Sequence, residues 1–115
     1  MFHFNLRLVG LTAAIVGLGL MSTAAIAQDA ANGRDVYEIT CVACHAENGR
    51  GAFEGVPDLS DRLAKSDDAL FTSVRDGFES PGSMMAMPAN GGNPNLTEQD
   101  VRDVIAYMRE TYGGN

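Results

Sequence analysis

One short run of the chain carries side chains suited to bond a cofactor covalently, and it reads Cys41, Val42, Ala43, Cys44, His45. The spacing Cys-x-x-Cys-His is the attachment sequence of a c-type haem. Two thiols at i and i+3 leave one side of a helical turn, so both can add across the vinyl groups of one porphyrin. His45, at i+4 from Cys41, then lies where it can bind the iron as the proximal axial ligand. The run therefore predicts one haem c with its iron.

Other uses of these residues fit the rest of the chain less well. A zinc site needs about four N or S ligands, whereas the chain has 2 Cys and 2 His, and His3 lies in a segment that we expect to be removed. A thioredoxin-like redox pair needs flanking strands, but no alternating run of β-branched or aromatic residues borders the motif. A structural disulfide would leave the adjacent His45 unexplained.

The N-terminal segment has the pattern of an export signal. Arg7 supplies a positive charge, residues 8–27 are uncharged, and small residues precede the expected cleavage at Gln28. An uncleaved anchor is the alternative, because about 20 residues can cross a bilayer, although glycine, serine and alanine make this stretch weakly apolar. We expect a cleaved signal peptide over residues 1–27 and one small domain over residues 28–115.

Residues 28–115 are acidic. They carry 7 Lys and Arg against 15 Asp and Glu, a net charge of −8. This charge argues against nucleic acid or an anionic membrane surface as a partner. It favours a redox protein that docks through a basic patch, although the same charge would also keep a small exported protein soluble.

The domain is poor in large apolar side chains. Leu, Ile, Val and Phe make up 15 of its 88 residues, a share at which a charged chain is usually disordered. A centrally bound porphyrin would supply the missing apolar surface. We therefore expect the haem itself to form the core.

Three main helices are predicted, and no segment has the pattern of a strand. The first begins with Asp29 as N-cap and runs into the haem motif. The second begins after Ser66 and ends at Gly77. The third begins at Thr97, which forms a capping box with Asp100, and its expected buried stripe is Val101, Val104, Ile105 and Met108.

Two smaller features complete the expected all-α domain. Residues 60–64 can form a short helical turn. Arg102 and Arg109 lie off the buried stripe of the last helix and are expected to be solvated charges.

The pattern Gly33-x-x-x-Tyr37-x-x-x-Cys41-x-x-Cys44-His45 resembles the opening of the class I cytochromes c. The resemblance covers nearly all of the domain, and it implies the cytochrome c fold around one haem. In that family the first and last helices cross near such a glycine, and an aromatic residue of the last helix packs on it. Tyr107 is the matching residue here. The subgroup resembles either the cytochrome c-five group or the haem domain of cbb-type oxidase subunits.

The segment from Phe78 to Asn95 has no periodicity, and a loop of this length in a small domain is usually functional. It contains three methionines, Met84, Met85 and Met87. Met87 is the best placed distal ligand, because Pro88 fixes its own φ and holds the preceding residue extended. The family's Met-Pro pattern falls on the same residue. The other two loop methionines could substitute for it. The remaining candidates are Met108, which is expected on a helix face, Lys65, which would first have to lose its proton, the N-terminal amine and water.

The second ring nitrogen of His45 also needs a partner. A metal-binding histidine usually donates its other N–H to a carbonyl or carboxylate, which fixes the ring. In the resembling family the acceptor is a proline carbonyl shortly after the motif, and Pro57 is the candidate here; an ordinary turn proline is the alternative. Leu59 and Phe53 would then be wall residues of the haem pocket.

These features predict a periplasmic electron carrier, exported in a Gram-negative bacterium as the resemblance implies. Its iron would cycle between Fe(II) and Fe(III) with His/Met ligation, which raises the reduction potential. We expect electrons from a dehydrogenase or quinol-oxidising complex and a terminal oxidase or reductase as acceptor. A docked haem subunit of such a complex would work by the same chemistry.

A haem protein with an open iron position, which binds a gas or activates peroxide, is the alternative from another class. The domain has one histidine and therefore no second one to act as a distal acid or base. We expect no enzymatic activity and no small-molecule substrate. Contact with a membrane is expected only through a partner complex, unless residues 1–27 remain as an anchor.

Overall fold

The computed structural model describes residues 17, 19–20 and 27–113. Its elements in chain order are α1 (Ala30–Val36), the π-helical segment η1 (Tyr37–Cys41), α2 (Val42–His45), α3 (Leu59–Arg62), α4 (Asp67–Asp76), the 3₁₀ segment η2 (Ala89–Gly92) and α5 (Glu98–Tyr112). The described residues form no strand, and a single isolated antiparallel bridge pairs Phe78 with Met87. The predicted all-α class is confirmed.

The predicted signal segment, residues 1–27, lies outside the described residues apart from positions 17, 19, 20 and 27. Within the part of the chain that the structure does describe, none of the helices combines the length and the apolar character that a membrane span requires.

The helices begin at the polar residues that the sequence marks as caps. The Asp29 carboxylate accepts the first free N–H groups of α1, and the Ser66 hydroxyl accepts the N–H of Ala69 in α4. Thr97 and Asp100 form the predicted capping box of α5, each side chain accepting the other residue's backbone N–H. Because these contacts lie within one turn of sequence, the local pattern was enough to predict them.

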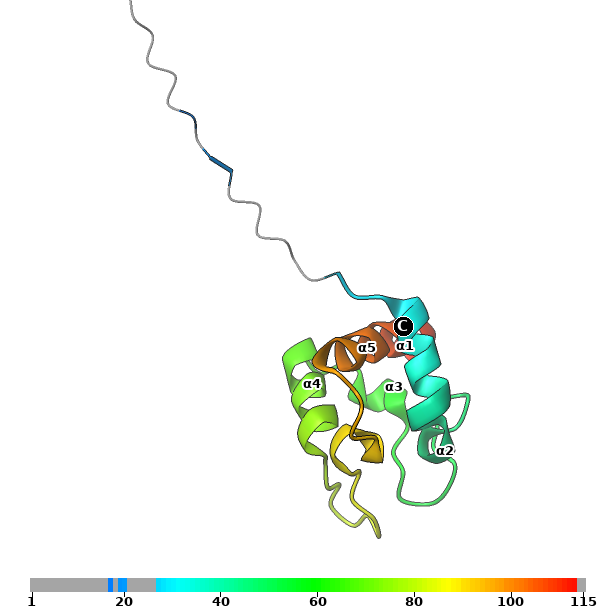
Figure 1. Cartoon of the computed structure of the whole chain (residues 1–115). Helices are drawn as coiled ribbons and strands as arrows, with labels where there is room; N and C mark the ends of the chain where they lie inside the picture. Colours follow the sequence, from blue (N-terminus) through cyan, green and yellow to red (C-terminus); the bar gives the residue numbers. More distant parts are fainter. Residues whose placement is uncertain (1–16, 18, 21–26, 114–115) are drawn as a thin grey trace, which may run out of the picture.

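Helices α1 and α5 cross at Gly33, as Figure 1 shows at the upper right of the domain. A Cβ built on Gly33 would lie 2.5 Å from the carbonyl carbon of Asp103 and 2.9 Å from the Cβ of Tyr107. The two backbones therefore approach to a distance that only glycine permits. The predicted crossing and the predicted role of Tyr107 are both confirmed.

A buried carboxylate fastens the same crossing. Asp103 is buried in α5 and accepts hydrogen bonds from the Asp29 N–H at 2.8 Å, Asn32 Nδ2 at 2.8 Å and Gln99 Nε2 at 2.7 Å. Burial works against the charged form, but these donors outweigh it and lower the pKa of Asp103. The start of α1 is thereby tied to the middle of α5.

The protein core lies where α1, α3 and α4 meet α5. The buried apolar side chains are Val36, Tyr37, Leu59, Leu63, Leu70, Phe71, Val101, Val104, Ile105 and Met108. All four residues of the stripe predicted for the last helix belong to this set. This side-chain core fills only one side of the domain, and a cavity lies directly beside it.

The two arginines of α5 differ from the prediction that they are solvated charges. Arg109 donates hydrogen bonds to the carbonyls of Leu63 and Lys65, both at 2.7 Å, and pairs with Asp67 at 2.6 Å. The guanidinium carbon of Arg102 lies 4.5 Å from the centre of the Phe71 ring. The prediction was wrong because both arginines face the connection and helix that pack beside α5, which the pattern of α5 alone does not reveal.

A second difference is the π-helical turn between α1 and the haem motif. The sequence predicts one continuous helix, but the Val42 N–H bonds to the carbonyl of Tyr37, five residues earlier. This turn inserts one residue relative to α-helical spacing, and such insertions often occur beside functional sites. It rotates the start of α2 relative to α1, and α2 is the segment that carries the motif.

Candidate cofactor site

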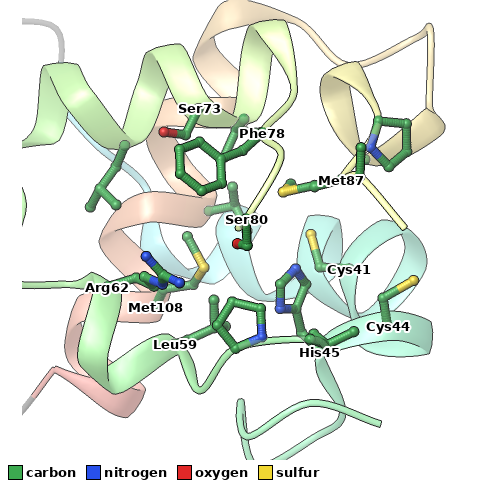
Figure 2. Close-up of a pocket in the computed structure, with 18 of the residues that line it drawn as sticks. Cys41, Cys44, His45, Leu59, Arg62, Ser73, Phe78, Ser80, Met87 and Met108 are labelled. Carbon is green, nitrogen blue, oxygen red and sulfur yellow. The ribbon is translucent and has the colours of Figure 1, made fainter. Parts of the chain in front are cut away.

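The cysteine and histidine residues of the motif come from one short helical segment. Cys41 is the last residue of η1, and Cys44 and His45 lie on α2. Both thiols are free and half-buried. Figure 2 shows the Cys41 sulfur beside the His45 ring, and the ring points into the adjoining cavity.

The cavity lies between the motif, the core face of α5 and the loop that follows α4. It encloses about 1290 Å³ of space, part of which is open to solvent. The residues that line it include Cys41, Cys44, His45, Pro57, Leu59, Leu63, Leu70, Val74, Phe78, Met85, Met87, Leu96, Val104 and Met108. Its walls are largely apolar, and the histidine and the thioethers point to a ligand that combines a flat apolar body with a metal.

Met87 faces the cavity from the wall opposite His45 (Figure 2). Its backbone is held at both ends, because its N–H bonds to the Phe78 carbonyl at 2.8 Å and its carbonyl accepts the Phe78 N–H at 3.0 Å. Gly77, with φ +85°, lies so close that a Cβ there would be 2.7 Å from the Met87 carbonyl oxygen. The loop therefore presents this thioether from a fixed backbone.

The other two loop methionines are placed differently. Met84 is 95% exposed and is not part of the cavity wall, whereas Met85 is 58% exposed and touches the cavity at its edge. Met87 is half-buried. Of the three loop methionines, Met87 is the one that combines a half-buried side chain with a backbone held by hydrogen bonds.

The methionine loop is also attached to the segment that carries Cys41. Asn93 Nδ2 donates a hydrogen bond of 3.1 Å to the Thr40 hydroxyl. Gly91, with φ +61°, packs against the same threonine, whose methyl carbon would lie 3.0 Å from an added Cβ. The two opposite walls of the cavity are therefore joined on one side by direct contacts.

Burial adjusts the ionisation of the motif. It lowers the pKa of His45, which favours the neutral ring that a metal requires. Burial, together with the neighbouring Cys44, raises the pKa of Cys41 to about 12, so its thiol keeps its proton until a haem is attached. His45 Nδ1 is buried and has no hydrogen-bond partner. The paired cysteines and the apolar cavity with a facing thioether together fit a covalently bound haem.

The supporting residues agree only in part with the sequence. Leu59 lines the cavity as predicted. Phe53 does not: it is 45% exposed on the loop after α2, because that loop turns outward at Gly51 and Gly55, both with positive φ. Pro57 lines the cavity, but no hydrogen bond joins its carbonyl to His45 Nδ1, so that pairing stays a prediction.

Arg62 is a cavity residue that the sequence did not reveal, and Lys65, which the sequence offered only as a disfavoured iron ligand, lies at the same cavity. Both line the cavity, and their charged groups lie 5.9 Å and 4.7 Å from the centre of the Phe78 ring. Among the described residues, neither forms an ion pair. In so acidic a domain, two cations without a carboxylate at the same cavity fit the two carboxylate groups of a haem. The sequence signal that could have indicated this role is the presence of two cationic residues, three positions apart, in a segment rich in aspartate.

Comparisons with known proteins agree with this site. A family model described as cytochrome c oxidase, cbb3-type, subunit III matches residues 28–108. Cytochrome c-555 of Prosthecochloris aestuarii is 38% identical over 84 residues, covering 70% of this chain and 85% of that protein. Cytochrome c-555 of Chlorobaculum tepidum is 35% identical, covering 84% of this chain and 91% of that protein.

Among solved structures, the c-type cytochrome XoxG from Methylobacterium extorquens AM1 superposes with a TM-score of 0.58 at 26% identity. The match covers 73% of this chain and 51% of XoxG, so this chain spans about half of that protein. The fold, the cavity with its Cys-x-x-Cys-His segment and these relatives lead to one conclusion: the chain belongs to the cytochrome c family, whose proteins carry electrons on a covalently bound haem c.

Proposed function

We propose that this protein is a one-electron carrier in which His45 and Met87 are the two axial ligands of the haem iron and Cys41 and Cys44 hold the porphyrin through thioether bonds. The observation that carries the proposal is that His45 and Met87 face the same apolar cavity from opposite walls. Bound there, haem supplies an iron that alternates between Fe(III) and Fe(II).

Each protein group has a defined task in this proposal. The Cys41 and Cys44 thiols each add to a vinyl group, so that the sulfur bonds to one carbon and its proton goes to the other. His45 acts as a neutral ring, which burial favours. The neutral Met87 sulfur stabilises Fe(II) and raises the reduction potential. The Pro57 carbonyl is the proposed acceptor for the second ring N–H of His45.

The cations at the cavity would balance the haem's own charge. Arg62 and Lys65 are the residues that we propose to pair with its two carboxylates, because both line the cavity and neither pairs with a described carboxylate of the chain. Positive charge at the walls of a haem cavity would also favour Fe(II) over the more positive Fe(III). The carboxylates would then be neutralised by the protein and the iron would remain easy to reduce.

A carrier is favoured over an enzyme by what lines the cavity. Among the described lining residues there is no aspartate or glutamate and no histidine other than His45. Arginine and lysine stay protonated near neutral pH, so the cavity offers no group to move a proton at a substrate. This supports electron transfer without a small-molecule substrate.

The cellular setting is part of the proposal. We propose that residues 1–27 are a signal peptide, cleaved before Gln28, and that the domain of residues 28–115 works in the periplasm. One observation supports this boundary: the family match begins at residue 28.

The proposed partners are redox proteins. The net charge of −8 on residues 28–115 suits docking to basic patches. A dehydrogenase or quinol-oxidising complex is the proposed donor, and a terminal oxidase or reductase the proposed acceptor. Contact with a membrane would come only through such a complex.

The ligand assignment is tested with three methionine variants of the holoprotein. Met87→Ala should lower the reduction potential, because a thioether that stabilises Fe(II) is lost. Met84→Ala and Met85→Ala are matched controls from the same loop, since neither side chain is buried in the cavity, and both should keep the wild-type potential and spectrum. If the reduction potential fell in Met85→Ala and stayed at the wild-type value in Met87→Ala, the axial ligand would be Met85 instead.

A further inference from the structure

The residue directly after His45 has a backbone conformation that alanine rarely adopts. Ala46 has φ +63° and ψ 166°, a region that is populated almost only by glycine. Such a conformation persists only where the surrounding structure imposes it, and it is concentrated at functional sites. The question is which contacts impose it here.

Two tyrosine hydroxyls hold the backbone at this point. The Tyr37 hydroxyl donates a hydrogen bond of 2.6 Å to the carbonyl of Ala46, and the Tyr112 hydroxyl donates one of 2.6 Å to the carbonyl of Glu47. The Ala46 N–H is also bonded, to the Val42 carbonyl at 2.8 Å. Two consecutive carbonyls after the histidine are thus fixed by side chains, one from the segment just before the motif and one from the C-terminal helix.

The tyrosines are themselves held by ring packing. The ring centre of Tyr37 lies 5.4 Å from that of Tyr107 and 5.7 Å from that of Tyr112. Tyr37 is 1% exposed, and burial raises its pKa, so that its hydroxyl keeps its proton. Gly49 lies against the Tyr112 ring, where an added Cβ would be 3.0 Å from ring atoms. The hydroxyls are therefore fixed in place by the crossing of α1 and α5.

The held segment continues without a break into the motif. The His45 carbonyl accepts the Gly51 N–H at 2.9 Å, and the Cys44 carbonyl accepts the Ala52 N–H at 2.9 Å. The loop thus folds back on the two residues that end α2. A relaxed Ala46 would change the backbone direction at His45 and with it the orientation of the ring.

We propose that Tyr37 and Tyr112 are positioning residues for the axial histidine: their hydroxyls hold Ala46 in its strained conformation and so fix the orientation of the His45 ring at the iron. This inference rests on the proposed role of His45 as an axial ligand. It assigns the C-terminal helix a part in the haem site, although Tyr112 is 67 residues distant from His45 in the sequence.

The test compares three Tyr→Phe variants of the holoprotein. Tyr37→Phe and Tyr112→Phe each remove one hydroxyl and keep the ring. Tyr107→Phe is the matched control, because Tyr107 packs in the same cluster while the carbonyls of Ala46 and Glu47 accept from Tyr37 and Tyr112 instead. The readout is the set of paramagnetically shifted haem methyl resonances of the ferric protein, which respond to the orientation of the axial histidine ring.

We expect Tyr37→Phe and Tyr112→Phe to change the order or spread of the haem methyl resonances, and Tyr107→Phe to leave them as in the wild type. Amide exchange at Gly49 and Gly51 should become about tenfold faster in the first two variants, in line with the loss of one hydrogen bond. Ala46→Gly, which removes the strain, should restore the wild-type resonances when combined with Tyr37→Phe.

Unchanged resonances in both Tyr37→Phe and Tyr112→Phe, with haem covalently attached, would overturn the inference and leave the proposed ligation standing. Equal changes in Tyr107→Phe would also overturn it, because ring packing would then be the cause. If Tyr37→Phe does not yield folded protein with covalently attached haem, the Tyr112→Phe variant provides the test alone, because Tyr112 is more exposed than Tyr37. A wild-type protein whose His45 does not bind the iron would instead refute the proposed function.

Discussion

The crossing of α1 and α5 predicts that Gly33→Ala destabilises the protein although alanine is the better helix former. The added Cβ would lie 2.5 Å from the carbonyl carbon of Asp103 and 2.9 Å from the Cβ of Tyr107. Both are rigid parts of α5 rather than flexible side-chain ends, so the helices must separate. Overpacking of this kind costs about 1–3 kcal/mol, and the clash with backbone places it at the upper end. The gain in helix propensity returns only about 1 kcal/mol.

The expected net loss is therefore about 2 kcal/mol in the free energy of unfolding. In a domain of this size that lowers the melting temperature by about 8–16 °C. The assay is thermal unfolding of the ferric holoprotein, followed by circular dichroism. Ala31→Gly on the exposed side of the same helix is the control, with a loss of about 1 kcal/mol from propensity alone. A Gly33→Ala variant as stable as the wild type would refute the close crossing.

Three further predictions concern the cofactor, the fold and docking. Replacing Cys41 and Cys44 together by serine should abolish covalent haem and leave the chain largely unfolded, because large apolar residues are few; native circular dichroism without haem would contradict this. Arg109→Ala should cost about 1–2 kcal/mol in denaturant unfolding, whereas Arg34→Ala, which loses only an exposed pair, should leave the stability unchanged. Electron transfer to a basic partner should slow as salt rises, because exposed charges are screened beyond about 8 Å at physiological ionic strength; a flat rate would reduce the charge of −8 to a solubility feature.

Much of the fold could be predicted because its signals are local. Asp29, Ser66 and Thr97 cap the helices that follow them within one turn, and the stripe of α5 repeats at helical spacing. Gly33 indicated the helix crossing for a different reason. A glycine inside a helix costs stability, so its presence suggests that another helix packs closely against that position. The crossing partner could be named only through the family resemblance.

The remainder depends on contacts between distant segments. The Tyr112 hydroxyl reaches the Glu47 carbonyl, 65 residues away in the sequence, only because α5 packs against the segment that carries the motif. No local pattern marks Ala46 as strained. Phe53 was expected in the pocket because it is apolar and follows the motif, but the glycines beside it turn the loop outward. Arg62 is a cavity residue because α3 packs under α5, a matter of tertiary arrangement.

The carrier function depends most directly on whether Met87 occupies the sixth position on the iron. The decisive measurement is the absorption spectrum of the ferrous wild-type holoprotein at neutral pH, with and without carbon monoxide, beside that of Met87→Ala. If His45 and Met87 both bind the iron, carbon monoxide should not change the spectrum of the wild-type protein. The Met87→Ala variant, by contrast, should bind the gas. Ready binding of carbon monoxide by the wild type would show an open iron position and contradict the electron-carrier function.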